Sequence, residues 1–168
     1  GHRLNREGMP VVKNVVGLLP GTDPLLKDTY ILVTAHYDHV GVRADAQGDD
    51  KIFNGANDDG SGTVAVIEIA RAIAASKATT KRSVLFVCFF GEERGMQGSG
   101  YYGQNPLFPL RQTVANLNIE MIGRTKKFSE DPAKKGAIED WSNRLGVTGF
   151  DYSDMGARLL ASGKKAGI

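Results

Sequence analysis

The sequence predicts an α/β fold in which buried strands alternate with a helix. Two runs of β-branched and aliphatic residues, 30–35 and 83–90, have the composition of buried strands. Between them, residues 61–76 carry alanine and aliphatic side chains at helical spacing. The chain has 168 residues, which is enough for one hydrophobic core, so we expect a single domain over residues 1–168.

In chain order, the first expected element is a short strand at 14–19, which a Pro-Gly pair closes. The strand at 30–35 comes next. Residues 43–60 are rich in Asp, Gly and Asn and have almost no periodicity, so they predict a loop. The helix at 61–76 follows, with Ser61 as its expected N-cap. The residues on its expected buried face are Val66, Ile69, Ala70 and Ile73.

The second half of the chain adds a third apolar run at 114–122, after the strand at 83–90. Residues 126–140 are charged and irregular, and we expect a surface excursion there. A helix is expected near 155–164.

Charge and composition exclude several classes of function. The formal net charge of +2 is too small to indicate binding to nucleic acid or to an anionic membrane. No apolar run has the length of a transmembrane helix. The single cysteine, Cys88, excludes an internal disulfide and is expected in the core. The oligomeric state is left open.

Four groups of polar residues stand at the C-terminal ends of the strands or in the loops beyond them, where ligands bind in open α/β sheets. They are His36 with Asp38, Asn57-Asp58-Asp59, Glu92-Glu93, and Glu120. If the strands are neighbours, the groups converge, and so many carboxylates disfavour one another's ionised forms unless cations are present. Zinc accepts both nitrogen and carboxylate oxygen, and two adjacent ions would polarise a water and a carbonyl together.

Each group also has a purely structural explanation. A histidine after a strand is more often a satisfied polar residue, and His36 alone would have roughly one chance in five of being a ligand. Asp58 lies in a Gly-rich loop, where Asp usually makes a turn. Paired glutamates are usually solvated. Glu120 lies inside an apolar run, however, and a carboxylate is expensive to bury there unless it is paired or bound to metal. The four groups together favour a metal site.

Four motifs appear in order in this sequence: Ala35-His36-Tyr37-Asp38-His39, Gly55-Ala56-Asn57-Asp58-Asp59-Gly60-Ser61-Gly62, Phe90-Gly91-Glu92-Glu93 followed by Gly98-Ser99, and Asn118-Ile119-Glu120-Met121-Ile122-Gly123. Together they resemble the two-zinc aminopeptidases, a family of zinc exopeptidases related to glutamate carboxypeptidase and glutaminyl cyclase. The resemblance runs from about residue 14 to residue 124. It implies a central mixed, largely parallel β-sheet flanked by helices.

The resemblance also implies roles for individual residues. His36 and Glu93 would bind one zinc each, Asp58 would bridge the two ions, and a cis peptide bond would join Asp58 to Asp59. Glu92 would be the general base, and Asp38 would lie behind His36 and fix its tautomer.

Two departures from the family pattern stand out. Glu120 occupies the position of a ligand that is usually Asp, and we keep it as a zinc ligand. The family's last ligand is a histidine near the C-terminus, whereas this chain has only His2, His36 and His39. Because His39 is so close to His36 in sequence, we do not expect it to reach the other ion. The chain is therefore expected to be incomplete at its C-terminus.

The implied function is hydrolysis of N-terminal peptide bonds by a hydroxide held between two zinc ions, with a peptide carrying a free N-terminus as substrate. A carboxypeptidase or a one-zinc glutaminyl cyclase on the same scaffold is the alternative among enzymes. A non-catalytic metal-binding domain and a plain structural α/β domain are alternatives from other classes. The resemblance to exported bacterial proteins implies a periplasmic or extracellular location.

Overall fold

The computed structural model describes residues 11–128, 137–140, 142 and 144–167. Contacts divide the chain into two compact units, Gly1–Met121 and Ile122–Ile168. All the candidate ligands belong to the first unit. Among the described residues, no helix is both long enough and apolar enough to cross a membrane.

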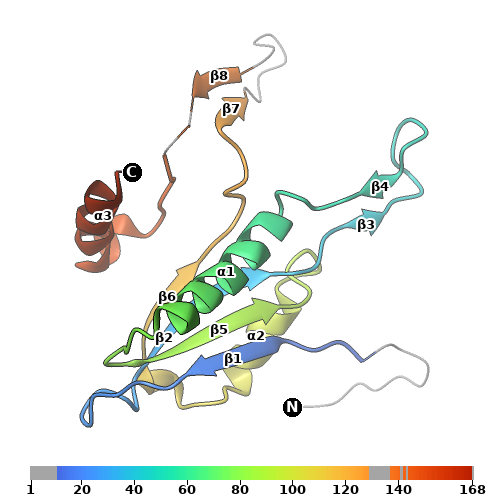
Figure 1. The fold of residues 1–168 in the computed structure, drawn as a ribbon. Coiled ribbons are helices and arrows are strands. Elements are labelled where there is room, and N and C mark those ends of the chain that lie inside the picture. Colours follow the sequence, from blue (N-terminus) through green and yellow to red (C-terminus); the bar gives the residue numbers. More distant parts are fainter. Residues whose placement is uncertain (1–10, 129–136, 141, 143, 168) are drawn as a thin grey trace. The chain divides into compact units, whose positions relative to one another are not determined.

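The first unit is built on a four-stranded sheet in the order β1-β5-β2-β6 (Figure 1). Its strands are β1 Val15–Leu19, β2 Tyr30–His36, β5 Ser83–Phe89 and β6 Thr113–Asn118. β2 pairs in parallel with β5 and β6, and β1 pairs antiparallel with β5 at one edge. The predicted mixed, largely parallel sheet is therefore confirmed.

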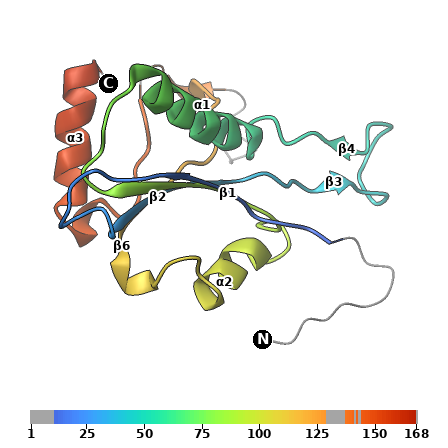
Figure 2. The same cartoon turned by 60° about the horizontal axis from the view of Figure 1, so that its bottom comes forward.

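Helices cover both faces of this sheet, α1 (Gly60–Ser76) on one side and α2 (Gln97–Gln104) on the other (Figure 2). Alternate residues of the two central strands supply the two cores, as the two-residue period of a strand requires. The core on the α2 side contains Tyr30, Leu32, Leu85, Val87, Phe89 and Tyr102. The core on the α1 side contains Val33, Ala35, Val66, Val84 and Phe86, with Ala70, Ile73 and Cys88 packed against it.

Four local predictions need correction. The predicted loop at 43–60 contains β4 (Ile52–Phe53), which forms a small hairpin with β3 (Gly41–Val42). Ile69 on α1 is exposed, not buried. The other two corrections concern α2, which was not predicted, and the N-cap of α1. Helix α2 carries Gly98, Gly100 and Gly103 in eight residues. Because glycine has a low helix propensity, such a segment does not predict a helix.

The second unit contains a hairpin and a helix. β7 (Lys126–Phe128) pairs antiparallel with β8 (Ala137–Asp140), so the region expected to be irregular includes two strands. A short 3₁₀ helix, η2 (Phe150–Tyr152), precedes α3 (Met155–Ala166), close to the predicted helix. The minor elements are completed by η1 (Leu110–Gln112), which leads into β6 in the first unit.

Candidate metal centre

The sheet places the predicted residues at one edge because its three parallel strands end together there. His36, the last residue of β2, pairs with Phe89 at the end of β5. On the other side of β2, Thr34 pairs with Asn118 at the end of β6. The residues that follow β5 and β6, and the loop that enters α1, therefore reach the same place as His36.

His36 is buried, with 4% of its surface exposed. Its Nδ1 lies 3.1 Å from the backbone carbonyl oxygen of Asp38. A carbonyl can only accept, so Nδ1 carries a proton, and in the neutral form of the ring Nε2 keeps its lone pair. Nε2 lies 3.2 Å from Oδ1 of Asp58 and 3.9 Å from Oε2 of Glu92, and makes no hydrogen bond with any described residue. The neutral imidazole therefore presents a free lone pair to a group of carboxylates.

The pKa of His36 is raised by its surroundings. Burial alone lowers it, but the hydrogen bond to the Asp38 carbonyl and the negative charges of Asp59, Glu92 and Asp38 outweigh burial. The same negative potential attracts a divalent cation to Nε2.

Asp38 acts on His36 through its backbone. Its carboxylate Oδ1 lies 3.7 Å from Nδ1 of His36, farther than the carbonyl oxygen. That carboxylate instead accepts hydrogen bonds from the backbone N–H groups of Gly91 and Glu92, at 2.7 and 3.1 Å. Asp38 thus sets the tautomer of His36 with one group and holds the Glu92 backbone with another.

The loop before α1 presents Asp58 to the site and buries Asp59. The peptide bond between the two is cis, as the resemblance implied. Asp59 is 1% exposed, and its Oδ1 accepts from the backbone N–H of Gly62 at 3.0 Å, which makes it the N-cap of α1. The prediction of Ser61 as the cap is wrong. The Ser61 hydroxyl donates to the carbonyl of Asn57 instead.

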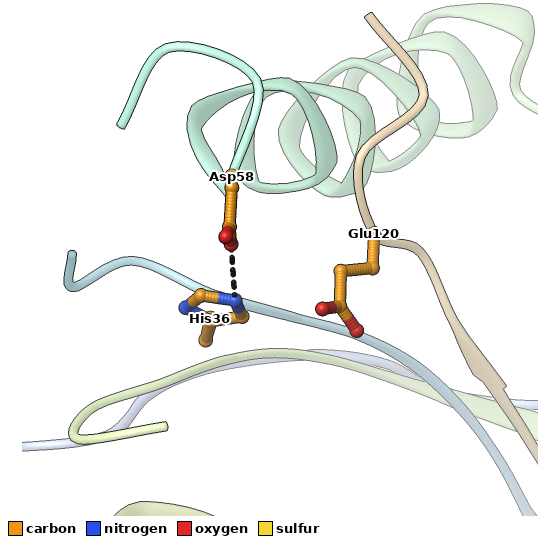
Figure 3. A group of neighbouring side chains, drawn as sticks. All are labelled: His36, Asp58 and Glu120. Atoms are coloured by element: carbon orange, nitrogen blue, oxygen red, sulfur yellow. Dashed lines mark ion pairs between the residues drawn. The ribbon is translucent and has the colours of Figure 1, made fainter. Parts of the chain in front are cut away.

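Glu120 differs from the prediction in its exposure. It was expected to be buried, but the residue is exposed, because it follows the edge strand β6. Partial burial of its carboxylate still raises the pKa of Glu120; the positive charge of His36 opposes this, and the charges of Asp59, Glu92 and Asp58 add to it. Figure 3 shows Glu120 approaching His36 and Asp58 from the segment after β6.

Two sets of donors result, and Asp58 belongs to both. One set is His36, Asp58 and Glu120, and the other is His39, Asp58 and Glu93. Within each set, one ligand atom per residue lies within 4.8 Å of the others. His39, which we did not expect to reach the other ion, lies beside the second group: its Nδ1 is 2.7 Å from Oε1 of Glu93.

The donor atoms themselves test whether cations fit. Nε2 of His36, Nδ1 of His39 and Oε1 of Glu93 are buried, and none of them has a hydrogen-bond partner among the described residues. Buried polar atoms almost always have a hydrogen-bond partner, so three buried atoms without one, all near the carboxylate of Asp58, call for an explanation. Imidazole nitrogen and carboxylate oxygen are the ligands of zinc, and the donor set fits it.

A cavity of about 260 Å³ opens beside the first set. His36, Glu92 and Glu120 line it, so it can bring a small group next to the ligand atoms. The rest of the lining mixes apolar and polar residues: Ala35, Phe89, Phe90 and Met96 with Thr34, Ser99, Asn116 and Asn118. A larger cavity of about 520 Å³ lies between β1 and α2, and none of the candidate ligands lines it.

The first unit is thus an α/β sheet with two overlapping sets of nitrogen and carboxylate atoms at its C-terminal edge, where ligands bind in such sheets. The chain belongs to peptidase family M28, which it matches over residues 14–148. The matched range contains all four motifs described in the sequence.

Several relatives are similar over much of this chain. It is 34% identical over 158 residues to a "probable zinc metalloprotease" of Pyrenophora tritici-repentis, covering 90% of this chain and 33% of that protein. It is 33% identical over 102 residues to aminopeptidase YwaD of Bacillus subtilis, covering 60% of this chain and 20% of that protein. The crystal structure of BSAP, a zinc aminopeptidase from Bacillus subtilis, superposes with a TM-score of 0.53 at 29% identity, covering 68% of this chain and 26% of that one. The chain thus spans about a third or less of these relatives.

Proposed function

We propose that this chain is the metal-binding part of a zinc aminopeptidase that hydrolyses N-terminal peptide bonds. The observation that carries the proposal is the position of Glu92, whose Oε2 lies 3.9 Å from Nε2 of His36 at the wall of the cavity. The names of the relatives support the choice of an aminopeptidase. Two zinc ions bound there would supply an acidified water and a polarised carbonyl.

The roles proposed for the residues follow from their positions. His36, Asp58 and Glu120 hold one ion, Glu93 helps to hold the other, and Asp58 is shared. Glu92 belongs to neither donor set and faces the cavity, so its carboxylate is available to take a proton from the attacking water and to deliver it to the leaving amine. Asp38 holds the Glu92 backbone through two N–H groups, which keeps this carboxylate beside the donors.

The variant Glu92→Gln tests this proposal. It keeps the shape of the side chain but cannot accept the proton, so kcat for an aminoacyl p-nitroanilide should fall by about 10² to 10⁴-fold. Zinc content, measured by elemental analysis, should stay at the parent value. Glu68→Gln is the control, because Glu68 pairs with Arg71 on the exposed surface of α1 and should not affect either quantity. A Glu92→Gln variant as active as the parent would show that Glu92 is not the base.

The choice of substrate separates the alternatives. An aminopeptidase requires a free N-terminus, so N-acetylated peptides should be inert. Cleavage from the C-terminus would indicate a carboxypeptidase, and cyclisation of an N-terminal glutamine would indicate a cyclase. Zinc binding with no turnover of any of these would indicate a metal-binding domain. A periplasmic or extracellular location stays a prediction from the family resemblance.

A further inference from the structure

We propose that Asn54 and Gly55 form a site of spontaneous deamidation, and that the isoaspartyl product displaces the loop that presents Asp58. The modification needs no enzyme, because an asparagine followed by glycine reacts with its own backbone. It goes beyond the proposed function, and only its effect on zinc rests on that function.

The reaction starts when the backbone nitrogen of Gly55 attacks the side-chain Cγ of Asn54. A C–N bond forms, the bond from Cγ to the amide nitrogen breaks, and the amide leaves as ammonia with the proton of the backbone nitrogen. Water then opens the cyclic succinimide. Attack at the side-chain carbonyl gives aspartate, and attack at the backbone carbonyl gives isoaspartate, whose main chain runs through Cβ and Cγ. Water is the only other reactant.

Both reacting groups of this pair are free. Asn54 is exposed and follows β4 directly, outside any helix or strand. Within the described part of the chain, neither its side-chain amide nor the N–H of Gly55 makes a hydrogen bond. Glycine also lacks a Cβ, so no side chain shields its nitrogen from the attack.

A second pair of this kind lies in the same loop, and the fold protects it. Asp59 is also followed by a glycine, and its carboxylate can cyclise in the same way. However, Asp59 is 1% exposed, and its Oδ1 accepts from a backbone N–H. The N–H of Gly60 donates to the carbonyl oxygen of Gly55 at 2.9 Å, so this nitrogen is not available. The fold therefore protects one pair and leaves the other open.

The loop cannot absorb the longer main chain of isoaspartate, which inserts an extra carbon directly before Gly55. A Cβ added at Gly55 would stand 2.6 Å from the Cβ of His39 and 2.9 Å from the backbone oxygen of Asp58. The carbonyl of Gly55 also closes the loop on Gly60. Displacement of Gly55 breaks these contacts and moves the carboxylate of Asp58 away from Nε2 of His36, from which it now lies 3.2 Å.

The test compares the 168-residue parent with Asn54→Gln after incubation in mildly alkaline buffer. Glutamine keeps the amide but must close a larger ring, which forms more slowly, so this variant is the matched control. Peptide mass spectrometry with electron-transfer fragmentation distinguishes asparagine, aspartate and isoaspartate at this position. Asp59 is the internal control, because it should isomerise only after the chain is unfolded in urea.

In the parent, we expect the zinc content to fall as the isoaspartyl fraction rises, and unfolding to move to lower urea concentration. Asn54→Gln should show neither change. An Asn54 that reacts in urea but stays intact in the folded chain would overturn the inference. A high isoaspartyl fraction with unchanged zinc content and unchanged unfolding would do the same. A fresh parent that binds no zinc would contradict the proposed function alone, because the mass change and the unfolding are measured without metal.

Discussion

Asp58 and Asp59 are neighbours in sequence with opposite environments. Asp58 is partly exposed and turns its carboxylate to His36. Asp59 is fully buried, and its carboxylate accepts hydrogen bonds from backbone N–H groups. Sequence reasoning marked the pair as one acidic group and could assign a ligand role only through the family resemblance. The two side chains differ because only the carboxylate of Asp59 lies next to backbone N–H groups. Those N–H groups are at the end of β2, at the start of α1 and after the end of β6.

Cys88 gives a prediction at the residue scale. Burial, followed by the negative charge of Asp59, raises the pKa of the Cys88 thiol above its ordinary value of 9.0. A raised pKa means less thiolate at any given pH, and the thiolate is the reactive form. At pH 8, alkylation by iodoacetamide should therefore be at least about tenfold slower in the folded chain than in urea.

The check is the rate of alkylation against pH, followed by mass spectrometry. The folded chain should reach half of its maximal rate above pH 9.0, and the unfolded chain near it. Equal rates for the two states at pH 8 would contradict the assigned environment of Cys88.

The sequence predicted which residues converge at the sheet edge, but it did not predict the position of His39 or the exposure of Glu120. His36, Asp58, Glu92, Glu93 and Glu120 all converge at the predicted edge of the sheet. Their roles as ligands and base remain predictions. The position of His39 could not be read from sequence, because it depends on the close packing of Gly55 against it. The exposure of Glu120 was missed because apolar neighbours in sequence do not show that β6 is an edge strand.

At the scale of elements, the strands of the central sheet were predictable, whereas the two small hairpins and α2 were not. Runs of β-branched residues mark β2 and β5 directly, since both are buried on two faces. The N-cap of α1 lies two residues earlier than predicted, because the carboxylate of Asp59 accepts from the backbone N–H of Gly62, while the Ser61 hydroxyl donates to the carbonyl of Asn57. The glycines of α2 hid that helix, which packs Tyr102 against the core regardless.

Gly62→Ala tests the N-terminus of α1. A Cβ there would collide with the carbonyl oxygen of Ile119 and with both carboxylate oxygens of Asp59. Overpacking and loss of the cap should together lower the free energy of unfolding by about 2 to 4 kcal/mol, and zinc binding should weaken as well. Urea denaturation followed by circular dichroism measures the first effect, and calorimetric titration the second.

Gly100→Ala in α2 is the matched control. A Cβ at Gly100 meets nothing within 4 Å, so alanine should raise the stability by about 0.5 to 1 kcal/mol. If both variants shifted the urea midpoint equally, the crowding assigned to Gly62 would be wrong.

At the scale of the whole molecule, the chain matches family M28 from residue 14 to residue 148 and so includes part of the second unit. The prediction of a single domain over residues 1–168 remains a prediction beside this division into two units. The fold class was predictable because it depends on the order of a few strongly marked elements.

Zinc should stabilise the folded chain as a whole. The donors lie together only in the folded state, and their negative charges repel one another without a cation. Zinc at about 100 times its dissociation constant should add about 2.7 kcal/mol per site to the free energy of unfolding. Differential scanning calorimetry at increasing zinc should show a rising melting temperature, and a chelator should reverse the rise. A melting temperature independent of zinc would contradict a site formed by folding.

Asp59 ties the assembly of the proposed zinc site to the docking of three segments. Its one carboxylate accepts from the N–H groups of His36, Gly62 and Met121, which belong to β2, α1 and the segment after β6. His36, Asp58 and Glu120 are each next to or within one residue of these anchor points or of Asp59 itself. A nascent chain in which any one of the three segments has not docked therefore lacks the pocket for the ion. The proposed zinc site is therefore complete only in a chain whose sheet edge has assembled.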